Sequence, residues 1–243
     1  LYPLTEKEYH NFDSSRKTET FLAERLVFGN YPRLMHLKTR KDKRDYLEDL
    51  LLFYLGKIRL KTPKNGKDLQ LLKMLSYLVG EEIFYREMEH KVALTRVVIN
   101  KLMQQFSDMN LIIQLKGFKR NLKKEVGKHT CVYFMDNGIR NAVINNFNPV
   151  RIRNDSAKLW KNYLISERIK QQHYRDIETN NYFWRTYDQQ ELDWVEEKKG
   201  QLVGYRFTLD SLQPRVPHAW KKAYPQAEYK VINPDNYREW LNS

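Results

Sequence analysis

Hydrophobic residues recur at helical spacing through the first hundred residues of the chain. This pattern predicts helices over residues 14–28, 41–58, 67–79, 85–91 and 95–109. Ser14 or Ser15 is expected to cap the first helix, which Gly29 ends, and Gly80 is expected to end the third. A turn-rich stretch at residues 62–66 marks a first boundary between domains.

Strand-like patterns begin after these helices. Residues 111–115 and 131–134 flank a polar, basic loop, and three helices followed by two such strands is the order of a winged helix. Beyond Pro149 we expect a helix over 156–171 and three strands at hairpin spacing, 181–186, 191–197 and 201–209. A helix over 218–223, a strand over 228–232 and a short terminal helix complete the chain.

The predicted fold class is therefore α+β, with a helical N-terminal segment that contains a winged helix and a mixed-sheet α/β domain after it. The expected divisions are a helical segment over 1–62, a winged-helix domain over 63–148 and the sheet domain over 149–243.

Charge is concentrated in the middle of the chain. The 243 residues carry a formal net charge of +13. Residues 61–130 hold 14 Lys and Arg against 7 Asp and Glu, a net +7, whereas residues 1–60 and 131–243 each carry +3. A basic excess favours a polyanionic partner such as nucleic acid or a membrane surface.

Other compositional features narrow the class of protein. Cys131 is the one cysteine and lies in an apolar run, so no internal disulfide is expected and a cytoplasmic location fits. No run approaches about 18 apolar residues and the N-terminus lacks a signal-peptide pattern, so we expect no membrane partner.

The 95–109 helix and the loop after it carry the candidate nucleic-acid contacts. Val98, Leu102, Phe106 and Met109 are expected to face inward. The opposite face and the loop then present donors and cations that suit phosphates and base edges of duplex DNA: Thr95, Arg96, Asn100, Lys101, Gln104, Lys116, Lys119, Arg120, Lys123 and Lys124. Winged helices also hold proteins together and basic loops are often only solvated, so a protein-interaction or oligomerisation module, including a homo-oligomer, remains an alternative.

Several stretches together resemble prokaryotic P-loop ATPases of the AAA superfamily that carry a C-terminal domain of unknown function. The matching stretches follow one order along nearly the whole chain: Leu1-Tyr-Pro-Leu4, Phe28-Gly-Asn-Tyr-Pro32, Tyr46-Leu-Glu-Asp-Leu50, Tyr133-Phe-Met-Asp-Asn-Gly-Ile-Arg-Asn141, Tyr182-Phe-Trp-Arg-Thr-Tyr-Asp-Gln-Gln-Glu-Leu-Asp193, Tyr224-Pro225 and Val231-Ile-Asn-Pro-Asp-Asn-Tyr237.

This resemblance implies an ATPase domain that precedes Leu1, and the first residue of the chain, which is not Met, agrees with the middle of a larger protein. The sequence contains no Gly-x-x-x-x-Gly-Lys-Ser/Thr phosphate loop, so we expect no cofactor in these residues. ATP and Mg²⁺ are expected for the preceding ATPase domain, which is itself an expected partner. The family's end domain looks like a restriction-endonuclease-type fold.

Nucleases of that fold use a helix Glu, a strand Asp and a Glu-x-Lys on the next strand. By resemblance, Glu167 matches the helix acid and Asp193 the strand acid, but Arg206 and Thr208 stand where the Glu and Lys should be. A guanidinium at the metal position opposes Mg²⁺ and should pair with Asp193, so the nuclease site is expected to be inactive. A migrated carboxylate at Asp210, on the same strand face, would restore a metal-dependent nuclease and stays open.

The six histidines are scattered without metal-ligand spacing, so no zinc site is expected. Asp136 and Arg140 are expected to form a turn or an ion pair. The resulting hypotheses, in order, are a DNA-binding and regulatory part of an ATPase, a protein-interaction module of that ATPase, and a working nuclease. No enzymatic activity is expected from these residues themselves.

Overall fold

A computed structural model describes residues 2–12, 18–61, 66–120, 123, 125 and 129–243. The predicted caps Ser14 and Ser15 and the predicted DNA contact Lys124 lie outside the described residues. The helices are α1 (Glu6–Phe12), α2 (Thr18–Phe28), η1 (Pro32–His36), α3 (Arg40–Lys61), α4 (Lys67–Tyr77), α5 (Tyr85–Val92), α6 (Arg96–Asp108), α7 (Asn137–Val143), η2 (Val150–Ile152), α8 (Ser156–Tyr174), α9 (His218–Ala223) and α10 (Tyr237–Asn242).

One mixed sheet joins the two halves of the chain. Its strands are β1 (Ile112–Gly117), β2 (Thr130–Phe134), β3 (Asn180–Arg185), β4 (Glu191–Lys198), β5 (Gln201–Phe207) and β6 (Glu228–Ile232), in the spatial order β2-β1-β3-β4-β5-β6. The β1–β3 and β5–β6 pairs are parallel and the other pairs are antiparallel. The prediction of an α+β fold with a helical N-terminal part is confirmed, and β1 to β3 is the pairing that crosses residue 149.

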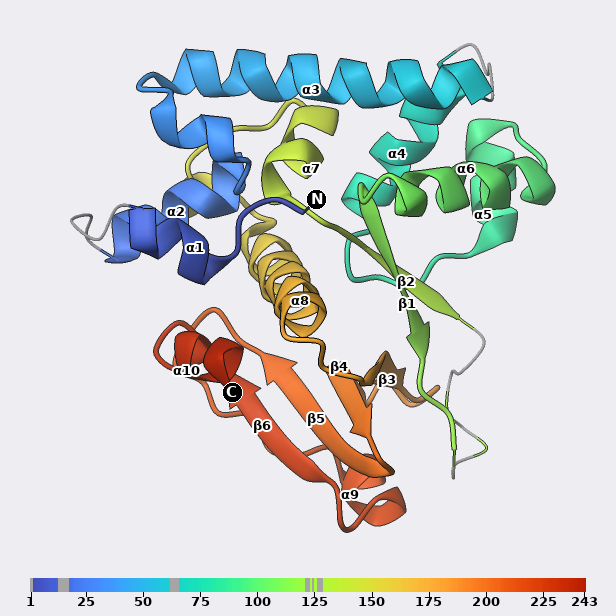
Figure 1. Cartoon of the computed structure of the whole chain (residues 1–243). Coiled ribbons are helices and arrows are strands. Elements are labelled where there is room, and N and C mark those ends of the chain that lie inside the picture. The colour runs from blue at the N-terminus through green and yellow to red at the C-terminus, as the bar shows by residue number, and fades with distance from the viewer. Residues whose placement is uncertain (1, 13–17, 62–65, 121–122, 124, 126–128) are drawn as a thin grey trace.

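Helices cover the sheet unequally on its two faces. The long helix α8 lies across one face of the β3–β6 region together with α10, and α9 lies on the other face (Figure 1). Trp184 and Trp220 are fully buried between the sheet and α9, which contains Trp220, whereas Trp160 and Trp194 are fully buried on the α8 side. The helix α3 spans the far side of the molecule from the sheet (Figure 1).

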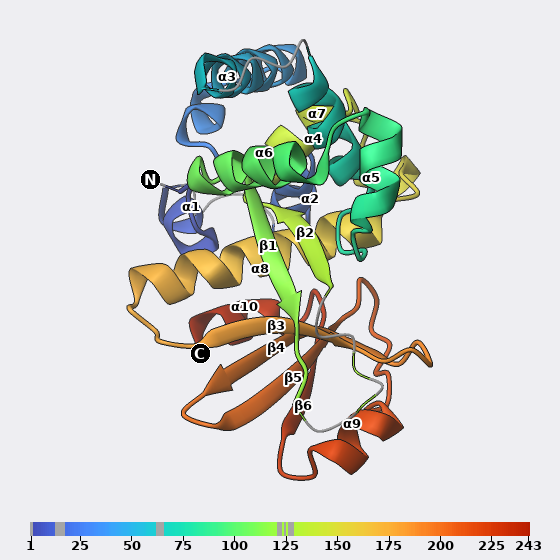
Figure 2. The ribbon, with the colours of Figure 1, turned by 90° about the vertical axis from the view of Figure 1, so that its right-hand side faces the viewer.

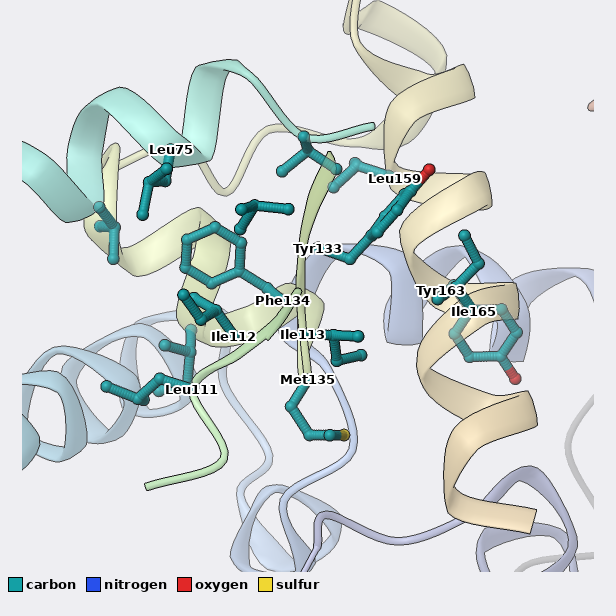
Figure 3. Packing of buried hydrophobic residues seen from close by; sticks show 14 of the residues in the cluster. Leu75, Leu111, Ile112, Ile113, Tyr133, Phe134, Met135, Leu159, Tyr163 and Ile165 are labelled. Carbon is teal, nitrogen blue, oxygen red and sulfur yellow. The ribbon is translucent and has the colours of Figure 1, made fainter. Parts of the chain in front are cut away.

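The main core runs from the N-terminal helices into the sheet half. Figure 3 shows Phe134 of β2 beside Leu75 and Ile112, while Tyr133 points toward Leu159 of α8. Burial on both faces explains why β2 is a continuous apolar run rather than an alternating one. The core therefore gives no sign of a break at residue 149.

Two of the sequence stretches quoted above interlock. The turn after α2 places Gly29 at φ 75°, where a side chain is strained, and the backbone N–H of Asn30 donates to Asp136 Oδ2 at 2.7 Å. Asp136 also caps α7 by accepting from the N–H groups of Gly138 and Ile139. Arg140 forms its ion pair with Asp155 at 2.5 Å, so Asp136 and Arg140 both have the structural roles that were expected, but through different partners.

The boundaries of the predicted elements agree with the structure within a few residues, but four short helices were not predicted: α1, η1, α7 and η2. The α7 residues are short, polar and Gly-containing and lack an amphipathic period. All of α7 is buried, and its stability comes from the Asp136 cap and from packing rather than from periodicity. In the described part of the chain, no helix is long and apolar enough to cross a membrane.

The close approach at Gly138 gives a test of this interlock. A Cβ on Gly138 would lie 2.0 Å from the carbonyl oxygen of Phe28, so Gly138→Ala is expected to lower the free energy of unfolding by about 2–4 kcal/mol. Gly56 in α3 is the matched control, because a Cβ there meets nothing within 4 Å and Gly56→Ala should stabilise by about 0.5–1 kcal/mol. Urea unfolding of both variants measures the difference in the free energy of unfolding. Equal effects of the two substitutions would contradict a close contact between Gly138 and the Phe28 backbone.

Candidate nucleic-acid interface and the nuclease-like pocket

Helix α6 packs against the core along a wider stripe than its sequence suggested. Leu102 and Phe106 are fully buried as expected, but Ile99 and Met103 are also fully buried. Val98 and Met109, predicted to face inward, are only partly buried. The buried stripe is therefore rotated from the predicted one, because α6 contacts both α5 and β1.

The opposite face of α6 is open to solvent. Thr95, Arg96, Asn100, Lys101 and Gln104 are all exposed, as their positions require for contact with a ligand. The Arg96 guanidinium lies 4.6 Å from the centre of the Tyr85 ring, and Gln104 donates to Asp108 at 2.7 Å. In Figure 2, α6 and β1 face the viewer, so nothing in the described chain covers this surface.

The basic residues after β1 divide into two groups. Lys116, Lys119 and Lys123 are exposed, and in the described residues none of them forms an ion pair. Arg120 is exposed as well, but it pairs with Glu197 of β4 and lies 5.5 Å from the centre of the Phe118 ring. Arg120 thus has an intramolecular role that the sequence did not reveal.

A buried carboxylate fixes this loop to the sheet. Glu125 is 1% exposed and accepts hydrogen bonds from Trp184 Nε1 at 2.7 Å and from the Tyr224 hydroxyl at 2.5 Å. It also accepts from the backbone N–H of Arg120 at 2.9 Å. The loop of the expected wing is therefore anchored at Glu125, the one acid that interrupts its basic run.

The residues that were matched to a nuclease motif by resemblance include Asp193, which a β-bulge turns toward α8. Between the pairs Tyr182–Val195 and Trp184–Leu192 the register shifts, so Asp193 and Trp194 together oppose one residue of β3. The Asp193 side chain then accepts from the backbone N–H of Phe207 at 2.8 Å. The bulge thereby places a carboxylate where the β4–β5 ladder ends.

Two cationic side chains form ion pairs with the carboxylate of Asp193. Lys161 Nζ lies 2.5 Å from Oδ1, and Arg206 Nε lies 3.5 Å from Oδ2. The expected Arg206–Asp193 pair is present, and Lys161, which the sequence analysis did not consider, is the closer partner. Because both oxygens are committed to positive charge or to a backbone donor, a divalent cation would have to displace a cation to bind Asp193.

Glu191 completes this set of charges. It lies 2.5 Å from Arg185 and 2.7 Å from Arg206. Burial by itself would raise the pKa of Glu191, but the hydrogen bond and charge of Arg206, with the charges of Lys161 and Arg185, lower it to about 2. We call Lys161, Arg185, Glu191, Asp193 and Arg206 the Asp193 cluster; it carries three cations and two anions.

The structure does not bring the other expected nuclease residues to Asp193. Glu167 lies six residues after Lys161 in α8, which turns it to a different side of the helix. There it accepts from the Asn30 side chain and the Glu6 backbone and pairs with Lys170 at 2.6 Å. The match of Glu167 to a metal-binding acid is therefore not supported by its position.

Thr208 and Asp210 have local roles at the end of β5. The Thr208 hydroxyl donates to the backbone oxygen of Asp210, and Asp210 accepts from the N–H of Leu212. Asp210 is thus part of an exposed turn, which is a poor position for a migrated catalytic carboxylate. Among the described residues, no three His, Cys, Asp or Glu side chains are arranged to hold a metal ion.

Cys131 is a core residue rather than a nucleophile. It is 1% exposed in β2, and burial raises the pKa of its thiol to about 12. A thiol with this pKa is protonated at neutral pH and unreactive.

The charges of the Asp193 cluster predict the effect of metal ions. We expect Mg²⁺ and Mn²⁺ to leave the melting temperature of the chain unchanged relative to EDTA and to support no cleavage of duplex DNA, because cations already hold Asp193. Metal-dependent cleavage that disappears in Asp193→Asn would contradict this, and loss in Asp210→Asn instead would identify a migrated carboxylate.

The lowered pKa of Glu191 predicts a pH dependence of stability. The folded-state pKa lies below the unfolded value, so the carboxylate stabilises the fold above about pH 4.5 and loses this effect as the pH falls toward 2. Glu191→Gln should therefore cost on the order of 2 kcal/mol from pH 7 to 5 and much less at pH 3. Denaturant unfolding across this range measures it. Glu228→Gln, which removes an exposed ion pair with Lys230, should change little at any pH.

Comparison with known proteins identifies families but no activity. A family model described as Domain of unknown function (DUF8612) matches residues 19–150, and one described as Domain of unknown function (DUF4143) matches residues 156–242. Neither a curated protein nor a solved structure matches the chain significantly. Since the first model covers more than half of the 243 residues, the chain belongs to the DUF8612 family.

Proposed function

We propose that this chain is a DNA-binding and regulatory part of a cytoplasmic protein that also contains an AAA-type P-loop ATPase domain, and that its nuclease-like half does not cut. The observation that carries the proposal is the uncovered polar and basic face of α6, with further cations on β1 and in the loop after it. We call this set the α6 surface: Thr95, Arg96, Asn100, Lys101, Gln104, Lys116, Lys119 and Lys123.

The connections around α6 agree with a winged helix. The helices α4, α5 and α6 precede β1 and β2, and residues between α4 and α5 form bridges to β2 at Val79–Val132 and Glu82–Cys131. In winged helices the third helix enters the major groove and the hairpin after it contacts the backbone. This arrangement supports α6 as the element that meets DNA.

The chemistry of the α6 surface fits a duplex better than an apolar partner. Asn100 and Gln104 carry amides suited to base edges, while Arg96 and Lys101 supply positive charge for phosphates. Lys116, Lys119 and Lys123 extend the charge beyond the helix. This surface carries five cations. If all five contact phosphates, a plot of the logarithm of the binding constant against the logarithm of the salt concentration should have a slope of about −4 to −5.

Contacts at Phe118 and Glu125, two described residues after β1, favour a preorganised interface. Glu125 ties the loop to Trp184 and Tyr224, and Phe118 donates its backbone N–H to the carbonyl oxygen of Phe183 at 2.7 Å. Loop residues held in this way lose less conformational entropy when they bind a ligand. The same contacts link the α6 surface to the sheet half, which gives a physical route for regulation.

Binding to duplex DNA tests the proposal. We expect the chain to bind a fluorescent duplex with an affinity that falls steeply as salt rises. The double variant Lys101→Glu, Lys119→Glu should bind at least tenfold more weakly and reduce the salt slope by about 2, because two phosphate contacts are lost. Fluorescence anisotropy at several salt concentrations measures both quantities.

The matched control reverses two lysines on elements that lie away from α6 (Figure 1). Lys7 of α1 and Lys230 of β6 are exposed, and Lys7→Glu with Lys230→Glu makes the same change in net charge. This control should retain most of the affinity. Equal losses in both double variants would show a response to net charge alone and would remove α6 as the interface.

A protein-interaction role is the second candidate, and a separate observation favours it. Leu52 and Phe53 of α3 are 62% and 56% exposed and lie side by side on a helix that faces away from the sheet (Figure 1). Exposed apolar pairs of this kind occur at protein interfaces. Self-association in sedimentation that Leu52→Asp abolishes, together with no affinity for DNA, would favour this role over the first.

A further inference from the structure

A second basic surface lies at the start of α3 and the proposed function leaves it unused. Residues 33–44 contain six Lys and Arg and a single acid, Asp42. Apart from Lys43, the cations of this stretch are exposed, and Arg151 of η2 is exposed as well. We call Arg33, Lys38, Arg40, Lys41, Arg44 and Arg151 the α3 surface.

A hollow of about 290 Å³ lies within this surface. Its lining includes Val27, Phe28 and Pro149 as apolar walls and Lys38 and Arg40 as cations. Lys43 and Glu24 also line the hollow, but they form an ion pair with each other, so their charges cancel. Lys38 and Arg40 therefore place positive charge at this hollow, as a phosphate group requires.

Arg40 is held in place at the edge of this hollow. Its Nη2 donates to the Phe147 carbonyl oxygen at 2.6 Å, and its guanidinium lies 5.0 Å from the centre of the Phe28 ring. Arg44 lies 3.4 Å from Asp45 and 3.6 Å from Glu48, whereas in the described residues Lys38, Lys41 and Arg151 have no ion-pair partner. One positioned cation with three unpaired cations in the same surface is suited to the repeated charges of a phosphate backbone.

The α3 surface and the α6 surface lie on opposite sides of the molecule. The 22 residues of α3 span about 33 Å, and their first turn lies beside α2 while their last lies toward α4 and α6 (Figure 1). The view that brings α6 to the front therefore places the start of α3 at the back (Figure 2). A single groove, about 12 Å wide, does not reach both surfaces.

We propose that the α3 surface is a second phosphate-backbone site, so that one chain holds two separate DNA duplexes at once. This inference rests on the proposed function, because the first duplex occupies the α6 surface. Binding two duplexes makes the chain a DNA-bridging module, in addition to a DNA-binding one.

A bridging assay tests this inference. Beads that carry one duplex are incubated with the chain and then with a second, fluorescent duplex, and the retained fluorescence is measured. We expect retention with the native chain and about a tenfold loss in the triple variant Lys38→Glu, Lys41→Glu, Arg151→Glu, whose affinity for a single duplex should remain close to native. The control Lys7→Glu, Arg215→Glu, Lys230→Glu makes the same charge change at exposed residues outside both surfaces and should still bridge.

The possible outcomes separate the two proposals. Unchanged bridging in the α3 triple variant overturns the second site, since bridging would then come from self-association through one site per chain. Loss of single-duplex binding in that variant also overturns it, because the α3 surface would then belong to one continuous site. Binding of one duplex by the native chain without bridging overturns the second site alone, and no binding of any duplex overturns the proposed function as well.

Discussion

The parallel pairing of β1 with β3 is the constraint on which the rest of the structure depends. It places the Gly117 backbone beside Phe183 and makes one sheet of strands that belong to two different family models. Because this pairing joins strands far apart in the sequence, it fixes the relative positions of the helices that precede them, α6 before β1 and α8 before β3. α6 therefore has a fixed orientation relative to α8 and the strands beneath it, instead of being a module on a tether.

Electrostatic balance governs the region that resembles a nuclease site. The bulge in β4 turns the Asp193 carboxylate toward α8, where it forms ion pairs with Lys161 of α8 and Arg206 of β5. Desolvated charges are retained only where they are paired, so such a site is internally satisfied without a metal. The same balance joins β3, β4 and β5 through Arg185, Glu191 and Arg206.

The sequence predicted the order of helices and strands well because amphipathic periods and turn residues are local signals. The Arg206–Asp193 pair was also predicted, because the resemblance to a nuclease motif placed a guanidinium at the position beside Asp193. Lys161 was missed because the facing position on α8 depends on how the helix crosses the sheet, and Glu167 was misplaced for the same reason. The buried role of Glu125 was equally inaccessible, because Trp184 and Tyr224 are 59 and 99 residues away.

The pairing of Asp193 bears on how this pocket can change during evolution. Removing Asp193 would leave Lys161 without its ion-pair partner, although Arg206 would keep its pair with Glu191, and replacing Arg206 by an acid would leave Lys161 to oppose any incoming metal. A single substitution in the Asp193 cluster therefore leaves at least one cation facing the remaining side chains, and each first step carries a penalty in stability. Relatives that keep an aspartate at this position would need it to neutralise Lys161 and Arg206.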